Sequence, residues 1–439
     1  MRPEADPHES GNRVAGGHDH NAPATPVSPA ARWWLTAALT PLLVATGVGL
    51  VLLWPNTHHF RTPPQFQTQT GQPVTYVHAT VISLLEQSCG STSTSGTSNH
   101  IAGGPSAGHS RCLTGHFHLT SGPDRGDAVV PLSTGAGEPV LPVGDRVTLA
   151  RASDERGRPA YYFEDFTRGL PLAALAATFA ILALAVGRRR GLRALLGLGV
   201  AFAALVGFAL PALLSGQDPL LVALTTGAAV ITTVLYLGHG LSARTTVAVL
   251  GTLGGLALVA GIGALAVGRA HLTGLSSDEL TAVQSSAPHL HATGILLAGL
   301  VIGSLGVLND VTVTQASAVW ELHHSNPALG RRRLSAAAMR IGRDHIASTI
   351  YTLLLAYAGA ALPVLLLFAQ SDQPLGVILG GDLVGSDIVR ALTGAIGLLL
   401  AVPITTGLAT AVVTHTFEPG PAGTATGVRP VNAATDHQR

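Results

Sequence analysis

The chain has 439 residues, of which 47% are hydrophobic and only 11% are charged. Soluble globular domains usually contain about 25% charged residues, so this composition argues against a large water-soluble fold and predicts a membrane protein. The 25 basic residues, all of them arginine, nearly balance the 24 acidic residues, so there is no basic excess that would indicate a nucleic-acid partner.

The first segment, residues 1–31, is polar, rich in Pro, Gly, Ala and His, and has no apolar periodicity. We predict that it is a disordered cytoplasmic tail. An apolar run of 22 residues follows, from Trp33 to Trp54. It is too long for a signal-peptide core and has no small-residue cleavage site after it, so residues 32–54 are predicted to be the first transmembrane helix. A cleaved signal peptide is the alternative.

Residues 55–169 differ from the rest of the chain, because their apolar runs are short and alternate with polar residues, as in β-strands. The predicted strands are Thr75–Leu85, Leu113–Leu119, Asp127–Leu132, Asp145–Arg151 and Ala160–Phe166. Five short strands in this length predict a small extracytoplasmic β-rich domain, either an OB-like barrel or a sandwich.

The two cysteines of the chain, Cys89 and Cys112, flank a Ser/Thr/Gly-rich stretch that is predicted to be a flexible loop, Gly90–Ser110. Because an extracytoplasmic domain folds in an oxidising compartment, we predict a disulfide between them. Two reduced, buried cysteines are the alternative.

Seven more apolar runs occupy residues 170–413. They are Leu170–Gly187, Ala194–Leu214, Pro219–Leu237, Thr246–Gly268, His291–Leu308, Ile346–Ala369 and Ile388–Val413. Each can cross a hydrocarbon core of about 30 Å, and backbone groups in lipid must bond internally, so each run is predicted to be a helix. The predicted fold is a polytopic α-helical membrane protein with about eight transmembrane helices, and residues 414–439 form a second disordered cytoplasmic tail.

Arginine is distributed unevenly between the short loops. Ten arginines lie in three alternate loops: Arg188, Arg189, Arg190, Arg193, Arg244, Arg331, Arg332, Arg333, Arg340 and Arg343. The other short loops contain only Arg269, with Arg390 just inside the last helix. Because short cytoplasmic loops are enriched in basic residues, this asymmetry predicts both termini in the cytoplasm of a bacterial plasma membrane and residues 55–169 outside.

Small residues and prolines inside the predicted helices indicate how the helices pack. The GxxxG spacings Gly251/Gly255 and Gly299/Gly303 allow close helix contacts in lipid. Kinks are predicted at Pro211, Pro363 and Pro403.

Three polar segments interrupt the apolar background: Gly238–Thr246, Asn309–Glu321 and Gly342–Thr352. The predicted orientation places all three at the cytoplasmic ends of helices. In the second segment, acidic and hydroxyl residues recur at i, i+4, i+7 and i+11 from Asp310, which predicts a helix that continues beyond the apolar run with a polar face. Acidic groups at membrane depth are costly and usually functional.

We therefore predict a polar site on the cytoplasmic side of the bundle. Its candidates are Asn309, Asp310, Thr312, Gln315, Glu321, Arg343, Asp344, His345 and Thr349, with His239, Arg244 and Thr245 as secondary candidates. Arg343 is expected to pair with a carboxylate, and His345 is of a type that changes charge near neutral pH. The alternatives are structural: Asp344 caps one helix, Thr245 or Thr246 caps another, and Arg343 reaches lipid phosphates.

Histidine is frequent, with 19 residues, but scattered. Close pairs, namely His18/His20, His116/His118 and His289/His291, are at most weak metal ligands, and no spacing matches HExxH or a Cys/His zinc motif. No metal and no cofactor is predicted.

The polar segments also resemble a known family. The stretches LNDVTVTQASAVWEL (308–322), GHG with RTT (238–240 and 244–246) and GRDHI through LAYAG (342–346 and 355–359) look like those of the YibE/F-like family of bacterial membrane proteins. The similarity extends from about Tyr161 to Val413 and is looser in residues 55–160. It implies the membrane topology and the importance of these motifs, but it supplies no substrate and no catalytic residue.

Transport is the favoured function, because many helices surround polar groups at one mouth of the bundle, and Asp310 is the best candidate for a protonatable group. Against it, no internal repeat or pair of broken helices is visible. The alternative is a non-transporting envelope protein whose outer domain binds a partner protein or a wall component. No HExxH or GxSxG motif is present, so we do not expect an enzyme. The expected partners are the lipid bilayer and either a small-molecule or ion substrate or an envelope protein, with no nucleic acid.

Overall fold

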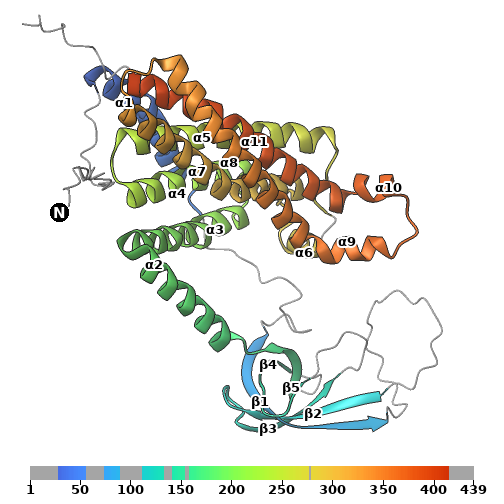
Figure 1. Cartoon of the computed structure of the whole chain (residues 1–439). Coiled ribbons are helices and arrows are strands. Elements are labelled where there is room, and N and C mark those ends of the chain that lie inside the picture. The colour runs from blue at the N-terminus through green and yellow to red at the C-terminus, as the bar shows by residue number, and fades with distance from the viewer. Residues whose placement is uncertain are drawn as a thin grey trace, which may run out of the picture.

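The computed structural model describes residues 28–55, 74–88, 111–132, 141–153, 158–275 and 278–414. Both predicted disordered tails lie outside these ranges, apart from residues 28–31 and 414. The helices form one bundle, and a curled sheet lies apart from it at the far end of α2 (Figure 1).

Each predicted apolar run is mostly helical. One additional short helix precedes the run His291–Leu308, and another precedes the last run, Ile388–Val413. The helices are α1 (Pro29–Leu52), α2 (Gly169–Ala204), the π-helix η3 (Leu205–Ala209), α3 (Leu210–Leu214), α4 (Pro219–His239), α5 (Ala243–Arg269), α6 (Asp278–Ser286), α7 (Ala292–Ser325), α8 (Arg331–Ala360), α9 (Leu362–Ala369), α10 (Leu375–Gly380) and α11 (Asp382–Thr414).

The sheet has all five predicted strands. They are β1 (Thr75–Ser88), β2 (Arg111–Leu119), β3 (Gly126–Leu132), β4 (Arg146–Ser153) and β5 (Pro159–Phe166), in the order β3-β2-β1-β4-β5 with every pair antiparallel. A bulge between Val81 and Ser83 lets the long strand β1 bend. The edge strands β3 and β5 contact each other, so the sheet curls around a core that includes Phe117 and Leu149. Since the described strands form one sheet, the sandwich alternative is wrong.

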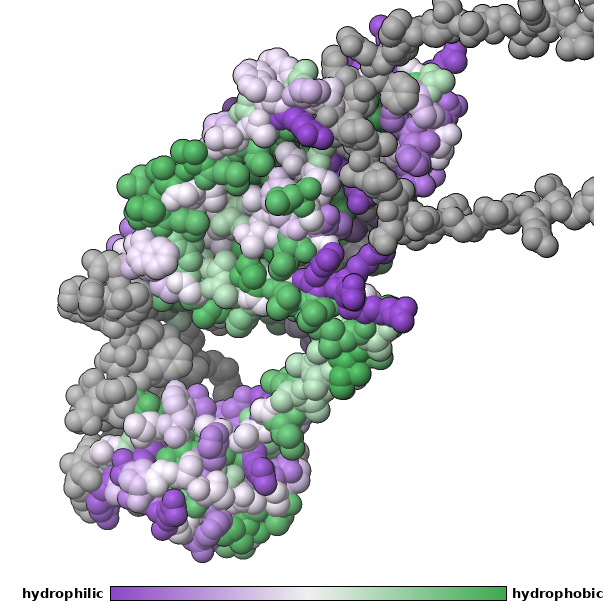
Figure 2. Space-filling model, turned by 90° about the vertical axis from the view of Figure 1, so that its left-hand side faces the viewer, coloured by the Kyte–Doolittle hydropathy of each residue, from purple (hydrophilic) through white to green (hydrophobic). Residues whose placement is uncertain are grey.

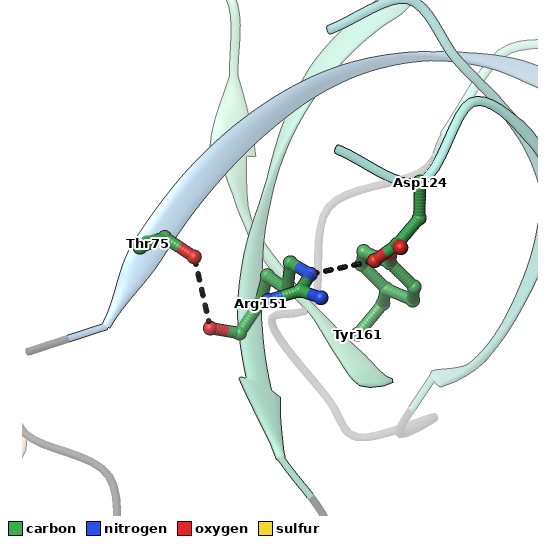
Figure 3. A network of polar contacts seen from close by, with 4 residues as sticks. All are labelled: Thr75, Asp124, Arg151 and Tyr161. Carbon is green, nitrogen blue, oxygen red and sulfur yellow. Dashed lines mark hydrogen bonds and ion pairs between the residues drawn. The ribbon is translucent and has the colours of Figure 1, made fainter. Parts of the chain in front are cut away.

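A small polar network fastens one end of the curled sheet (Figure 3). The turn before β3 supplies Asp124, whose Oδ2 accepts hydrogen bonds from Arg151 Nε at 2.7 Å and from Tyr161 Oη at 2.9 Å. These bonds hold the pKa of the Asp124 carboxyl below its usual value, and the bond from Arg151 has the larger effect. The bond to Asp124 also raises the pKa of Arg151, and burial raises that of the Tyr161 phenol. The network therefore joins the β2–β3 turn to β4 and β5.

The centre of the bundle is the contact between α5 and α11, which run antiparallel. A Cβ placed on Gly251 would lie 2.2 Å from Thr405 Oγ1, and one on Gly255 would lie 3.2 Å from Ala401 Cβ. A Cβ on Gly263 would lie 3.6 Å from Thr393 Cγ2. The contacting residues are thus spaced by four or eight positions along both helices, which keeps the same face of each helix in the contact. The predicted contact role of Gly251 and Gly255 is thus confirmed.

The second GxxxG motif behaves differently. Nothing lies within 4 Å of a Cβ on Gly299, and only the Tyr357 hydroxyl approaches one on Gly303, at 3.3 Å. The prediction of a close helix contact at this motif is wrong, because its glycines face away from the tightly packed core.

Six described helical segments are long and apolar enough to cross a membrane, or seven if the bent pair α8 and α9 is one span. Hydrophobic residues cover much of the helical part on the face shown in Figure 2, whereas the sheet mixes both kinds. The bend of 63° between α8 and α9 lies next to Pro363, as predicted. The predicted count of eight differs because Gly169–Leu214 is a single apolar segment of 46 residues by length and composition.

That segment nevertheless breaks at Arg188, where the backbone has φ 50° and ψ −125°. A Cβ on Gly191 would lie 1.9 Å from the carbonyl oxygen of Ala183, eight residues earlier, so the chain turns sharply between them. A glycine at 191 is what allows this close backbone approach.

Candidate functional site

The polar segment of α7 is helical throughout, as predicted, since α7 is continuous from Ala292 to Ser325. Its side chains divide between the inside and the outside of the bundle. Thr312 and Gln315 are buried, whereas Asp310 and Glu321 are exposed.

Gln315 is the central buried polar residue of the bundle. Its amide nitrogen donates to Thr406 Oγ1 of α11 at 2.6 Å and to the Ala338 carbonyl of α8 at 3.1 Å. The amide oxygen lies against α8 at Gly342, where an added Cβ would come within 2.8 Å of it. One side chain therefore joins three helices, and Gly342 provides the room for it.

A second buried contact joins α7 to α5. The hydroxyls of Thr312 and Thr252 lie 2.6 Å apart, and both residues are fully buried. Each hydroxyl also lies within hydrogen-bond distance of a backbone carbonyl of its own helix, so one hydroxyl can donate to the other while the second donates to its carbonyl. Thr312 is therefore a packing residue with satisfied hydrogen bonds.

Asp310 meets α8 at His345, with Oδ2 and Nε2 3.5 Å apart. This distance allows a charge contact when His345 is protonated, but it is long for a hydrogen bond. His345 Nε2 and the neighbouring Asn309 Oδ1 are buried atoms without a hydrogen-bond partner among the described residues. The Asp310 side chain is 67% exposed, so the site is open on one side.

The position of Asp310 along the bundle can be measured from the end of α4, because another α7 residue, Ser317, lies beside that end. A small cavity brings together His239 at the end of α4, Arg244 at the start of α5, and Ser317 of α7. Asp310 precedes Ser317 by seven residues, which is about 10 Å of helix rise. An α4 of 21 residues is about as long as a hydrocarbon core is thick. Asp310 therefore lies at a height about one third of the way along α4, counted from the His239 end.

Several predicted site residues do not join this contact. Arg343 and Asp344 are exposed, and the partner of Asp310 is His345, so the predicted Arg343–carboxylate pair is not formed with Asp310. Asp344 lies in the middle of α8, which begins at Arg331, so the structural alternative in which it caps this helix is wrong. The Thr349 hydroxyl donates to the carbonyl of His345.

The secondary candidates His239, Arg244 and Thr245 line the small cavity with Ser317. The N-cap of α5 is Ser242, whose side chain accepts from the Thr245 amide at 3.2 Å. The structural alternative, in which Thr245 or Thr246 caps this helix, is wrong, because the helix begins three residues earlier than the apolar run.

Sequence reasoning missed an ion pair at the opposite end of α11. Arg390 Nη1 donates to Asp387 Oδ1 at 3.0 Å, both side chains are about two-thirds buried, and Arg390 Nε has no hydrogen-bond partner among the described residues. The i, i+3 spacing of an acid and a base inside an apolar run was the available signal. Sequence reasoning also missed Thr406, the hydrogen-bond partner of Gln315, and no sequence pattern indicated its role.

Other predicted features fall partly outside the described residues. Cys89 and the side chain of Cys112 are among them, so the disulfide stays a prediction. The described residues contain no group of three or more His, Cys, Asp or Glu suited to a metal ion. Within them, His118 contacts Asp127 at 2.9 Å, and His289 lies 3.2 Å from the Leu214 carbonyl oxygen.

The comparisons with known proteins agree with the polar motifs. The family profile described as YibE/F-like protein matches residues 175–415, which is more than half of the chain. The chain belongs to the YibE/F-like family. The match begins within α2 and continues through α11, so it includes Gln315 and the Asp310–His345 contact, while α1 and the sheet lie outside it. No curated protein and no solved structure matches the chain.

Proposed function

We propose that this YibE/F-like chain is a multi-pass protein of the bacterial plasma membrane with eight spans. The turn at Arg188 supports counting Gly169–Leu214 as two spans, and α8 with α9 as one. The arginine asymmetry then supports cytoplasmic termini and an extracytoplasmic sheet. The strand order, with β3 and β5 in contact, fits an OB-like barrel.

Within that topology we propose a transporter or permease whose ion- or proton-binding site is formed by Asp310 and His345. The observation that supports it is an exposed carboxylate about 10 Å inside the end of the bundle, in contact with a histidine of the next long helix. A carboxylate that faced lipid at this depth would be costly, and this cost supports contact of Asp310 with water or a bound ion.

The chemistry of the site suits a mobile charge. The Asp310 carboxylate can hold a proton or a cation, His345 presents a ring nitrogen to it, and the buried amide oxygen of the preceding residue, Asn309, has no hydrogen-bond partner among the described residues. Because the two charged partners belong to α7 and α8, a change in protonation alters the attraction between two helices. Such coupling is what an ion-driven carrier requires.

The test is flux through the purified full chain in liposomes that contain a trapped pH-sensitive dye. Gradients of protons, Na⁺, K⁺, Mg²⁺, Ca²⁺ and phosphate are imposed in turn. We expect at least one gradient to give protein-dependent flux that Asp310→Asn abolishes, while the thermal stability of the detergent-purified variant stays near that of the wild type. Asp344→Asn is the matched control, because Asp344 is an exposed carboxylate of the same region outside the contact.

Two results contradict the proposal. Flux that Asp310→Asn leaves unchanged removes Asp310 from the mechanism. Lost stability in Asp310→Asn, without any flux in the wild type, shows that the contact only holds α7 and α8 together. The alternative function, an envelope protein whose outer sheet binds a partner, is then favoured and is tested by crosslinking to that sheet.

A further inference from the structure

A groove of about 660 Å³ lies between the first half of α8 and the end of α11. Its volume is within the range of about 300–1,000 Å³ that is usual for ligand sites. Four arginines of α8 line it, Arg331, Arg332, Arg340 and Arg343, and α11 contributes Gly407 and Thr410. Gly407 has no side chain and nothing lies within 4 Å of a Cβ placed on it, so the groove is open at this part of the α11 wall.

The arginines face one groove because of their spacing. Arg332 and Arg343 are eleven residues apart, or about three helical turns, so they lie on the same side of α8, with Arg331 and Arg340 on either flank. All four are exposed. No described Asp or Glu forms an ion pair with any of them. Four positive charges therefore share one groove in a chain whose net charge is only +1.

Beyond Arg343 the same surface becomes apolar. On α8 the stripe continues to Leu354, eleven residues further, whose side chain is 40% exposed. On α11 the stripe from Gly407 continues to Ile404 and Leu400, which are 36% and 39% exposed. The surface is thus basic at one end and apolar along the rest, which is the polarity of a phospholipid molecule.

We propose that this groove binds an anionic phospholipid, with its phosphate between the arginines and its acyl chains along the apolar stripes of α8 and α11. Arginine binds phosphate oxygens in a bidentate manner, and basic pockets between helices at the cytoplasmic surface suit anionic headgroups. A free phosphate shares the headgroup chemistry but makes no use of the apolar stripes. The proposal needs the membrane placement given above and does not need transport.

The test is lipid binding to the purified full chain in detergent, measured by native mass spectrometry with phosphatidylglycerol and, separately, phosphatidylcholine. We expect tighter binding of phosphatidylglycerol. The double variant Arg332→Gln/Arg343→Gln should weaken it roughly 10- to 30-fold, because each arginine near an anionic headgroup contributes about a factor of five. Binding of phosphatidylcholine should not change.

The matched control is Arg189→Gln/Arg193→Gln, which removes the same charge from α2 outside the groove and should bind phosphatidylglycerol like the wild type. Equal losses in both double variants would show a general charge effect and overturn the proposal, as would equal binding of the two lipids by the wild type. Displacement of phosphatidylglycerol by millimolar inorganic phosphate would assign the groove to a soluble anion instead. The last two comparisons use only wild-type protein, so they hold even if a variant misfolds.

Discussion

Replacing Gly342 with alanine tests whether the buried amide of Gln315 holds three helices together. The new Cβ would lie 2.8 Å from Gln315 Oε1 and 3.0 Å from Val402 Cγ1, so Gln315 must move. Its hydrogen bonds to Thr406 and Ala338 are then lost, at about 0.6 kcal/mol each for a membrane bundle, and overpacking adds about 1–3 kcal/mol. Alanine returns about 1 kcal/mol through its better helix propensity. We expect a net destabilisation of about 1–3 kcal/mol.

The assay is equilibrium unfolding of the purified protein in mixed detergent and SDS micelles. Gly299→Ala is the control, because nothing lies within 4 Å of its new Cβ, and it should be neutral or stabilising by up to about 1 kcal/mol. In a Gln315→Ala background, Gly342→Ala should cost clearly less, since the clashing oxygen is gone. The reasoning is refuted if Gly342→Ala behaves like Gly299→Ala, or if its cost is the same in both backgrounds.

Three further predictions concern the sheet and the topology. Asp124→Asn should reduce the hydrogen-exchange protection of β4 and β5 at pH 7. Because folding lowers the pKa of Asp124, its ionised carboxylate stabilises the sheet above about pH 4, and this stabilisation is lost as the pH falls further. The protection of the variant and of the wild type should therefore become equal at low pH. Equal protection at pH 7 would contradict this. Cys89 and Cys112 should be disulfide-bonded, closing a loop that contributes roughly 3 kcal/mol, and a non-reducing mass map with two free thiols would disprove it. In a cysteine-free background, a cysteine at Ser277 should react with an impermeant maleimide from outside and one at Ser335 should not; the reverse pattern inverts the topology.

The strands and most helix ends could be predicted from the sequence, because alternation of apolar residues and long apolar runs are local signals. The start of α8 could not. Hydrophobicity placed it at Ile346, whereas the helix begins at Arg331 with a polar, amphipathic half that carries no membrane signal. The number of spans stays a prediction, because the turn at Arg188 lies within one apolar segment, and length and composition alone do not divide that segment in two.

The candidate site was predicted only in outline. The sequence indicated that Asp310 lies near the segment after Gly342, and the structure places it there, but with His345 instead of Arg343. Residues 343 and 345 are two apart, about 200° around a helix, so the choice between them depends on the rotation of α8. That rotation is set by long-range contacts such as Gln315 to Thr406, which are 91 residues apart and leave no local pattern.

The central claim is that water reaches Asp310 from the cytoplasmic side of the membrane. A single cysteine at position 310 tests it most directly. The other cysteines are replaced by serine, and an impermeant maleimide is applied to inside-out and to right-side-out membrane vesicles. We predict rapid labelling in inside-out vesicles and no labelling from the outer face. A cysteine at 310 that remains unlabelled from both faces, while one at Ser335 reacts in inside-out vesicles, would show that Asp310 faces lipid or protein and would contradict the account.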